Sequence, residues 1–308
     1  MARPRDERGG RGSRGSRTLI LLVGTLLVVA CRRDAPIAKP VPASAPIPAA
    51  VVMRPYAMHV PVHHEARAPL LVFLHGFGGN HVDVEKRFGL DALADQNGVF
   101  VALPDGTLDA AGRRFWSASD ACCNFRKLPV DDVAYLDAII TDAVARHPID
   151  PARVYVAGYS NGGFMAHRYA CDRAERVAAV ASFAGEPWND ASLCKPGVPV
   201  TVLQVHGDED AVIHYAGAAA TTTRGDLPIG AYPASREAVA MWGRLDRCGP
   251  PTTTDDPHAE TLLYGGCAEG ANVALWTLHG ATHRLDDQLV DMRAVWAFLA
   301  AHSRRSPP

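Results

Sequence analysis

Glycines flank a serine in the run Gly158-Tyr159-Ser160-Asn161-Gly162. The apolar stretch RVYVA precedes this run directly. The stretch GFMAHRYACDRAERV follows it and has the composition of a helix. A serine at such a tight strand-to-helix turn is lifted clear of a sheet, and small residues two positions away relieve the crowding. The first turn of the helix also favours developing negative charge. Ser160 is therefore the predicted nucleophile, in preference to an idle serine in a glycine-rich turn.

Acidic residues follow the apolar run Val200–Val205 and supply the predicted partner for a catalytic base. A serine hydroxyl reacts readily only when a base takes its proton and an acid orients that base. In hydrolases with this serine turn, the acid follows the serine along the chain and the histidine comes last. We expect Asp210 to be the acid and keep Asp208 as the alternative, while Glu209 should point away. His206, directly after the apolar run, is expected to form the turn and to take no part in catalysis.

Two histidines follow the last apolar run, Val273–Leu278, in the sequence HGATH. His283 lies beyond Gly280 on a loop that must reach back over the serine. It is the predicted general base, because an imidazole titrates near neutral pH. His279 continues the strand and is expected to be structural.

Backbone N–H groups near the serine would stabilise the negative charge that develops on an attacked carbonyl oxygen. Asn161, directly after the serine, should supply one of them. The glycine-rich run HGFGG follows the apolar run LLVFL, and its glycines allow the backbone to approach a substrate closely. We expect the N–H group of Phe77 to be the second donor and His75 to brace the loop.

Six short runs are nearly all apolar, as strands buried on both faces of a sheet require. They are Leu70–Leu74, Val99–Leu103, Val154–Ala157, Ala178–Phe183, Val200–Val205 and Val273–Leu278. Amphipathic segments alternate with them. This alternation predicts the α/β class, with a mostly parallel sheet covered by helices on both faces.

Two helices are predicted from apolar residues that recur at three- and four-residue steps. The first spans residues 132–147 and ends at Pro148. The second spans residues 286–302, and either Asp286 or Asp287 could cap it.

Taken together, the motifs resemble the family of esterases that includes polyhydroxybutyrate depolymerases and feruloyl or acetylxylan esterases. The matching stretches follow the family order from residue 70 to residue 283: LLVFLHGFGGN, VALPDG, FW followed by CCN, VDDVAYLDAII, IDPARVYVAGYSNGGFMAHRYAC, VTVLQVHGDEDAVIHY and GATH. The resemblance implies an α/β-hydrolase fold and a carboxylic-ester hydrolase that needs no cofactor. It also implies that Ser160, Asp210 and His283 form the catalytic triad.

The substrate pocket is less well defined by the sequence. Family members usually carry Trp and Pro after the catalytic histidine, where this chain has Arg-Leu-Asp starting at Arg284. Trp116 and Trp188 lie in loops expected near the carboxyl ends of the strands, where they would either line the acyl pocket or pack against the protein. The resemblance also implies a disulfide between Cys248 and Cys267.

Seven cysteines are present, which is an odd number for an exported protein. If Cys31 carries a lipid, six remain, and an even set in an oxidising compartment indicates disulfides. Cys122, Cys123, Cys171 and Cys194 allow three pairings, of which a bond between the adjacent Cys122 and Cys123 is the least expected. The spacing of the cysteines fits no zinc site, and no metal is expected.

The N-terminal region has the layout of an export signal. Arg-rich residues 1–17 precede the apolar run Leu19–Ala30, whose 12 residues would span about 18 Å as a helix, too short for a hydrocarbon core of about 30 Å. The run ends in Val-Val-Ala-Cys, which resembles the lipobox of bacterial lipoproteins. Residues 1–30 are therefore an expected lipoprotein signal peptide and Cys31 the expected lipidation site, with an ordinary signal peptide as the alternative.

The remaining chain divides into a tether and a domain. Residues 31–50 are rich in Pro and Ala and should be extended, and residues 51–308 are long enough for one catalytic domain. Without residues 1–30, 25 basic residues face 31 acidic ones, so nucleic-acid binding is not expected. We expect an exported protein anchored to the bacterial cell envelope through Cys31, or secreted if Cys31 carries no lipid.

Hydrolysis of soluble or oligomeric esters through a serine acyl-enzyme is the leading functional hypothesis. Hydroxycinnamoyl, acetyl and 3-hydroxybutyryl esters are the expected substrate types. Acyl transfer or peptide cleavage on the same triad is one alternative, and a catalytically silent surface lipoprotein with a binding role is another. The sequence fixes neither the acyl and alcohol groups nor the oligomeric state.

Overall fold

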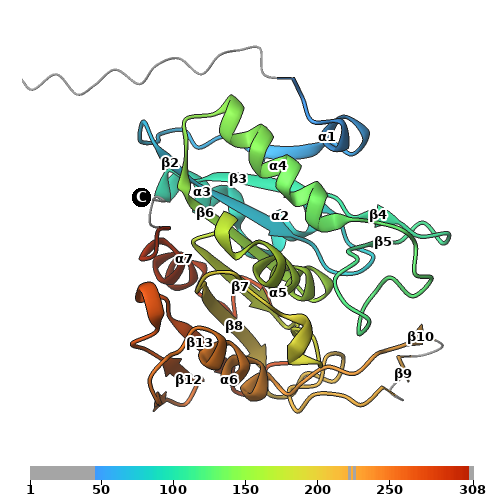
Figure 1. The fold of residues 1–308 in the computed structure, drawn as a ribbon, viewed down its shortest axis with the longest axis vertical. Helices are drawn as coiled ribbons and strands as arrows, with labels where there is room; N and C mark the ends of the chain where they lie inside the picture. The colour runs from blue at the N-terminus through green and yellow to red at the C-terminus, as the bar shows by residue number, and fades with distance from the viewer. Residues whose placement is uncertain (1–45, 221–222, 225–226, 305–308) are drawn as a thin grey trace, which may run out of the picture. The chain divides into compact units, whose positions relative to one another are not determined.

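Nine strands form a mixed sheet in the computed structural model, which describes residues 46–220, 223–224 and 227–304 (Figure 1). Their order across the sheet is β1-β3-β2-β6-β7-β8-β13-β12-β11. The six central strands run parallel: β3 (Phe100–Pro104), β2 (Ala68–Leu74), β6 (Ile149–Tyr159), β7 (Ala179–Phe183), β8 (Thr201–Gly207) and β13 (Val273–Leu278). Antiparallel strands extend both edges: β1 (Tyr56–His59), β12 (Ala259–Tyr264) and β11 (Pro251–Asp255).

The six parallel strands confirm the six apolar runs predicted from the sequence, although β6 begins earlier than its run. Every residue of β2, β3, β7 and β8 is buried. In β2, Leu70 and Val72 belong to one hydrophobic cluster, whereas Leu71 and Phe73 belong to the other. Successive side chains of a strand point to opposite faces, so a strand covered on both faces must be apolar throughout.

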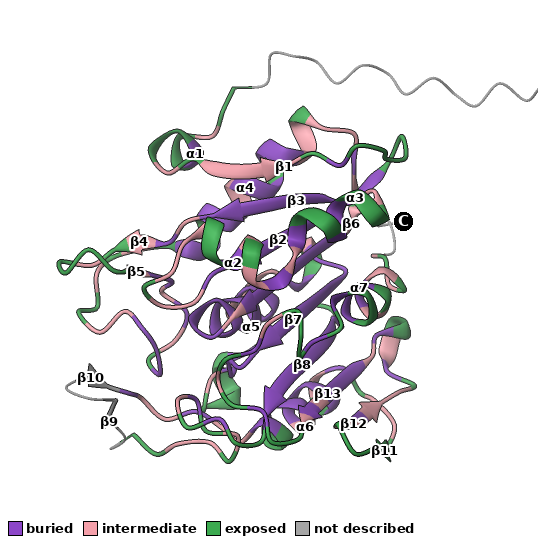
Figure 2. Cartoon of the chain, turned by 180° about the vertical axis from the view of Figure 1, so that it is seen from behind, coloured by how far each residue is buried: buried purple, intermediate pink, exposed green. Residues whose placement is uncertain are grey.

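Helices cover both faces of this sheet, as the α/β class requires. One face carries α1 (Ala49–Met53), α4 (Asp132–Arg146), α5 (Asn161–Arg173) and α6 (Ser235–Leu245), whose apolar side chains join the cluster that contains Leu70 (Figure 1). The other face carries α2 (His81–Phe88), α3 (Leu90–Asn97) and α7 (Met292–Ala300), which pack with Leu71 (Figure 2). The site described below lies where the parallel strands end and these helices begin.

The two predicted helices fared differently. The helix predicted over residues 132–147 is confirmed as α4. The prediction over residues 286–302 was wrong at its start, because α7 begins only at Met292 and is capped by Asp291. Asp286 instead accepts backbone N–H groups in a preceding turn, a local alternative that periodicity cannot distinguish from a helix start.

Short elements complete the described part of the chain. Two small strand pairs are β4 (Thr107–Leu108) with β5 (Arg114–Phe115) and β9 (Thr223–Arg224) with β10 (Leu227–Pro228), and single 3-10 turns are η1 (Ala174–Arg176), η2 (Ala191–Leu193) and η3 (Ala268–Gly270). The longest helix there, α4, has 15 residues, and none of the described helices combines the length and apolarity of a membrane span.

The expected signal peptide, the lipidation site Cys31 and most of the tether fall in residues 1–45, outside the described residues. All described residues belong to the unit Pro40–Pro308. Helix α1 begins at Ala49, so regular structure starts two residues before the expected domain boundary.

Three disulfides link the six remaining cysteines. The pairing of Cys248 with Cys267 is confirmed, and Cys171 bonds Cys194. Cys122 and Cys123 bond each other, which was the least expected pairing. The expectation was wrong because the other four cysteines pair among themselves, and the two adjacent side chains are buried together in one loop.

Candidate active site

Ser160 occupies the turn between β6 and α5 with φ 54° and ψ −118°, a left-handed conformation that a non-glycine residue rarely adopts. Glycines make this turn possible. A Cβ atom at Gly158 would overlap the carbonyl oxygen of Gly162, and one at Gly162 would overlap the carbonyl oxygen of Leu74. The turn thus places the serine at the N-terminus of α5, as predicted, with its side chain at the end of the sheet.

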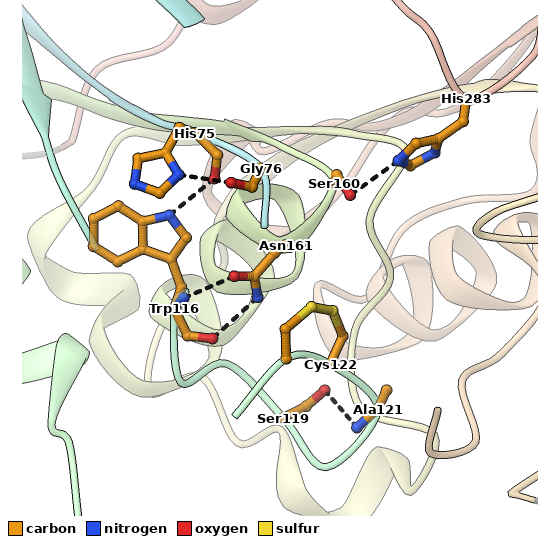
Figure 3. Close-up of a disulfide and its surroundings, with 10 residues drawn as sticks. His75, Gly76, Trp116, Ser119, Ala121, Cys122, Ser160, Asn161 and His283 are labelled. Atoms are coloured by element: carbon orange, nitrogen blue, oxygen red, sulfur yellow. Dashed lines mark hydrogen bonds between the residues drawn. A yellow bond between two sulfur atoms is a disulfide. The ribbon is translucent and has the colours of Figure 1, made fainter. Parts of the chain in front are cut away.

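His283 lies beside this serine. Its Nε2 atom is 3.0 Å from Ser160 Oγ (Figure 3). Its Nδ1 atom is 2.7 Å from Asp210 Oδ2. Because an ionised carboxylate can only accept, Nδ1 carries the proton and Nε2 is free to accept the hydroxyl proton of Ser160. Three residues far apart in the sequence therefore form one hydrogen-bonded chain, in the geometry that nucleophilic catalysis requires.

Tyr159 fixes the loop that carries His283. Its hydroxyl donates to the backbone oxygen of His283 at 2.7 Å, and the two ring centroids are 5.3 Å apart. The guanidinium of Arg87 lies over the ring of Tyr159, with its central carbon 5.1 Å from the ring centroid. Sequence reasoning missed this contact, because the residue between two motif positions gave no separate signal.

Asp210 is the carboxylate that reaches the histidine. Its Oδ1 atom accepts the backbone N–H groups of Val212 and Ile213 at 2.7 and 2.9 Å. Burial by itself raises the pKa of Asp210, but hydrogen bonds from His206 and His283 outweigh burial and hold this pKa well below its usual range. Asp210 is therefore ionised at neutral pH.

The alternative acid, Asp208, serves a different loop. Its Oδ1 atom accepts the N–H group of Gly280 at 2.7 Å, and its Oδ2 atom lies 3.1 Å from His279. His279 is also 2.9 Å from Asp255, and hydrogen bonds to both carboxylates raise its pKa. These contacts place the pair at the end of β13 as structural groups, as expected for His279, and Glu209 is exposed.

The expectation for His206 was wrong. It is not a turn residue but part of β8, fully buried, with Nε2 3.3 Å from Asp210 Oδ2. Its Nδ1 atom faces Glu186, which sequence reasoning missed entirely. Glu186 lies in the loop after β7, where no motif marks it, so only the three-dimensional fold brings it to this site.

The glycine-rich loop after β2 lies against the serine. A Cβ atom at Gly76 would be 3.3 Å from Ser160 Cβ, which shows how closely the backbone approaches. Within the described ranges, the backbone N–H groups of Phe77 and Asn161 donate no hydrogen bond to the protein. The two predicted donors therefore remain available beside the serine. His75 braces the loop as expected, because its Nε2 atom accepts the N–H group of Gly106 at 2.9 Å.

Trp116 packs inside the protein and does not line an open pocket. Its ring is fully buried, and its Nε1 atom donates to the backbone oxygen of His75 at 2.9 Å. Its backbone N–H and oxygen pair with the side chain of Asn161 at 2.7 and 3.0 Å (Figure 3). Of the two alternatives for Trp116, the structure shows packing, whereas Trp188 is half-buried beneath the guanidinium of Arg168.

A cleft of about 450 Å³ adjoins the glycine-rich loop after β2. Its lining combines polar and apolar surface, and it includes the loop residues Gly76 and Phe77 together with Tyr159, Arg87 and Arg284. Arg284 stands where the resembling family usually carries Trp, so this chain presents a cation at that position. Figure 3 shows the disulfide of Cys122 near Ser160 and Asn161.

No group of three or more His, Cys, Asp or Glu side chains in the described part of the chain is arranged to hold a metal ion. The cysteines there form disulfides.

Comparison with known proteins identifies the family. Residues 54–194 match the family model described as "Esterase PHB depolymerase". The Aspergillus niger protein named "Probable feruloyl esterase C" is 30% identical over 233 residues, which cover 71% of this chain and 77% of that protein. The chain belongs to the polyhydroxybutyrate depolymerase and feruloyl esterase family. The family match contains Ser160 but ends before Asp210 and His283, so the placement of these two residues rests on the geometry given above.

Other members of this family are longer. Feruloyl esterase B of Piromyces equi is 28% identical over 223 residues, which cover 71% of this chain and 40% of that protein. The bifunctional acetylxylan esterase/xylanase XynS20E of Neocallimastix patriciarum is 24% identical over 243 residues, covering 79% of this chain and 32% of that protein. The chain therefore spans well under two thirds of these two relatives.

Solved structures support the fold. The acetyl xylan esterase from Aspergillus awamori superposes with a TM-score of 0.60 at 15% identity, covering 79% of this chain and 92% of that chain. Together with the parallel sheet and the serine turn, this likeness confirms the α/β-hydrolase fold that the resemblance implied.

Proposed function

We propose that this protein is a serine carboxylic-ester hydrolase in which Ser160 is the nucleophile, His283 the general base and Asp210 the acid that orients it. The contacts of His283 carry the proposal, since its two ring nitrogens lie 3.0 Å from Ser160 Oγ and 2.7 Å from Asp210 Oδ2. Membership of an esterase family supports it independently.

The reaction proceeds in two halves. Ser160 Oγ attacks the ester carbonyl carbon while its proton passes to Nε2 of His283. The protonated His283 gives this proton to the departing alkoxide oxygen as the C–O bond breaks, and the acyl group stays on Ser160. Water then attacks the acyl-enzyme, His283 takes a proton from the water and returns it to Ser160 Oγ, and the carboxylic acid leaves.

Two backbone groups stabilise the oxyanion in both halves. The N–H group of Phe77 belongs to the loop after β2, and that of Asn161 to the first residue of α5. In the described residues neither has a protein acceptor. Preorganised donors of this kind lower the barrier by a few kcal/mol each, because they need no reorganisation when charge develops. Asn161 adds rigidity through its side chain, which is hydrogen-bonded to Trp116.

Substrates with a hydrophilic alcohol group suit the cleft. Its charged side chains, which include Arg87, Arg284 and Asp286, offer hydrogen bonds to hydroxyl groups. We therefore propose soluble or oligomeric esters as substrates, with acetyl, hydroxycinnamoyl or 3-hydroxybutyryl groups as the acyl part. A panel of these esters, with a long-chain alkyl ester as comparison, tests this. The highest kcat/KM for the long-chain ester would contradict the proposal.

The proposed activity is tested with p-nitrophenyl butyrate. We expect turnover in the wild type and a loss of kcat/KM of about 10⁴-fold or more in Ser160→Ala, since removing the nucleophile leaves only the oxyanion donors and binding. The exposed Ser192→Ala is the matched control and keeps wild-type activity. A fluorophosphonate should label the wild type and the control but not Ser160→Ala. Turnover that survives in Ser160→Ala would refute the assignment.

We also infer that the protein acts outside the cytoplasm, anchored through Cys31. The disulfides Cys171–Cys194 and Cys248–Cys267 support export, because such bonds persist in oxidising compartments. A lipid on Cys31 would move the expressed protein into the detergent phase of a two-phase extraction, and Cys31→Ser would return it to the aqueous phase. Equal partition of both proteins would contradict the anchor.

A further inference from the structure

A second imidazole contacts the same carboxylate oxygen of Asp210 as His283 does. His206 Nε2 lies 3.3 Å from Asp210 Oδ2 and 2.8 Å from the backbone oxygen of Ile213. The side chains of His206 and Asp210 are fully buried. His206 takes no part in the proton transfers described above, yet it lies in direct contact with the acid.

The protonation state of His206 follows from a chain of hydrogen bonds that begins at Trp242 in α6. The Nε1–H group of Trp242 can only donate, and it lies 3.1 Å from His167 Nδ1. His167 Nδ1 must therefore accept, which puts the single proton of this ring on Nε2. Burial lowers the pKa of His167 to about 4, so this ring is neutral. Its Nε2–H group then donates to Gln204 Oε1 at 2.8 Å.

This contact fixes the orientation of the Gln204 amide. Its Nε2 group must point the other way, where it donates to the backbone oxygen of Gly185 at 2.7 Å and to Glu186 Oε1 at 3.2 Å. The same Nε2 atom is also 3.2 Å from His206 Nδ1. One amide hydrogen goes to Gly185, and for the second the Glu186 carboxylate oxygen is a stronger acceptor than a ring nitrogen. The hydroxyl of Ser235 also donates to Glu186 Oε1, at 2.6 Å.

His206 Nδ1 has the Glu186 carboxylate as its strongest partner. It lies 3.1 Å from Glu186 Oε1 and 3.0 Å from Ser235 Oγ, whose own hydrogen is already directed at the carboxylate. On the other side of the ring, Nε2 faces the backbone oxygen of Ile213 and the carboxylate of Asp210. Each ring nitrogen thus faces a carboxylate, and a ring protonated on both nitrogens donates to both of them.

We propose that His206 is a positioning residue for ester hydrolysis: held as an imidazolium between Glu186 and Asp210, it fixes the Asp210 carboxylate that orients His283. The proposal rests on the proposed function. It adds a buried cation and its counter-ion, Glu186, to the groups on which the reaction depends. Neither residue touches the substrate or the reacting atoms, and both act through Asp210.

The charges around the ring agree with this state. Burial lowers the pKa of His206, but hydrogen bonds to Asp210 and Glu186 outweigh burial and raise it to about 9. Burial raises the pKa of Glu186 and outweighs the hydrogen bond to His206, which lowers it, so Asp210 is the stronger of the two anions beside the ring. The other titratable groups nearby are Tyr215, whose ring centroid is 5.9 Å away, and Tyr232, which lies close enough to Asp210 and Glu186 for them to raise its pKa. None of these groups supplies a competing positive charge.

A consequence for the pH dependence of catalysis follows. Below pH 9 the imidazolium donates to Asp210, whereas a neutral ring would turn a lone pair toward one of its acceptors and release its hold on the carboxylate. We expect kcat to fall as the pH rises through about 9 in the wild type. A group with a merely structural role would produce no such limb.

Two variants and a control test the proposal with p-nitrophenyl butyrate at saturation between pH 5 and 10. His206→Gln should lower kcat by about 10- to 100-fold with KM within about twofold, the loss usual when a group that orients a functional side chain is removed. It should also abolish the alkaline limb. Glu186→Gln should move that limb to lower pH by about one unit or more, because it removes one of the two anions that favour the imidazolium.

His279→Gln is the matched control. It also removes an imidazole held between two carboxylates, Asp208 and Asp255, but this ring does not touch Asp210. Its pH profile and kcat should follow the wild type. A kcat of His206→Gln within about threefold of the wild type, with an unchanged alkaline limb, would overturn the positioning role.

A direct measurement keeps the proposal decidable if His206→Gln does not fold. In protein labelled with ¹⁵N-histidine, both ring nitrogens of His206 should remain protonated up to about pH 8, and Glu186→Gln should lower the pH at which one proton is lost. Detection of a bare ring nitrogen on His206 at pH 7 would reject the imidazolium. If the imidazolium is present while no Ser160-dependent ester hydrolysis is found, the proposed function fails and the charge assignment stands.

Discussion

Two aspartates, Asp208 and Asp210, lie on the short loop after β8, and their partners assign them different roles. Asp208 binds the N–H group of Gly280 and the ring of His279, so it holds the loop after β13 in place. Asp210 binds His283 at 2.7 Å through one oxygen and two backbone N–H groups through the other. Residue type alone does not separate them, because each is an aspartate on the same short loop.

Asparagine substitutions should separate the two aspartates in activity. In Asp210→Asn the amide can present its NH₂ group to His283 Nδ1, which favours the tautomer that cannot accept the proton of Ser160. A loss of kcat of about 10⁴-fold is expected, the size seen when a triad acid is replaced in this way. Asp208→Asn should change kcat by less than about tenfold. Steady-state kinetics on p-nitrophenyl butyrate, with circular dichroism to verify folding, measure both, and a comparable loss in Asp208→Asn would contradict the assignment.

At the scale of elements, the strand–turn–helix unit of β6 and α5 depends on close backbone contact. The carbonyl of Gly162 fills the space that a side chain at Gly158 would need, and Gly162 itself lies against Leu74 of β2. The two glycines are therefore required by packing, apart from the strain at the serine. This explains why the turn holds the serine in one position relative to the glycine-rich loop.

Adding one methyl group should disrupt this unit. Gly158→Ala forces the turn away from Gly162 and should lower the free energy of unfolding by about 1 to 3 kcal/mol, the usual range for overpacking. It should also reduce activity by displacing Ser160. Gly197→Ala is the control, because a Cβ there meets no atom within 4 Å. Urea denaturation of both variants measures the difference, and equal stability would show that the turn can relax.

The elements that the sequence predicts well are those whose two faces are both buried. The six parallel strands belong to this group. Strand β11 was not predicted, because all five of its residues are exposed and its sequence PTTTD carries no apolar pattern. Strands β1 and β12 are largely half-buried at the sheet edges, where pairing depends on neighbours distant in the sequence.

The site shows the same limit. The positions of Ser160, Asp210 and His283 were predicted from a motif and the order of residues along the chain, and the fold brings them together. The contact between His206 and Glu186 could not be predicted in this way, because it joins β8 to the loop after β7 and Glu186 belongs to no motif. The pairing of Cys122 with Cys123 likewise depends on which cysteines the fold places near each other.

At the scale of the whole molecule, the helices of one face pack on the sheet through a long apolar cluster, and ionisable groups inside it affect the stability of the entire fold. Asp246 follows α6 directly and is fully buried. Its Oδ1 atom accepts the N–H group of Val200 at 3.3 Å, while Oδ2 has no hydrogen-bond partner among the described residues. Burial raises the pKa of Asp246 to about 7, because the hydrogen bond from Val200 and the charge of Arg247 offset burial only in part.

Stability should therefore fall as this group ionises. The ordinary pKa of the aspartate is 3.8, so between about pH 4 and pH 7 the folded state holds a proton that the unfolded state has lost. The free energy of unfolding decreases with rising pH in this window, by an amount on the order of 2 to 4 kcal/mol, and the destabilisation is complete above pH 7. Asp246→Asn removes the charge but keeps the shape, so it should match the wild type near pH 4 and be more stable above pH 7.

The exposed Asp256, whose pKa is lowered by backbone hydrogen bonds, is ionised in both states across the window, and Asp256→Asn should leave the slope unchanged. Urea denaturation at intervals from pH 4 to pH 8 compares the three proteins, and parallel slopes for the wild type and Asp246→Asn would show that Asp246 stays ionised inside the fold.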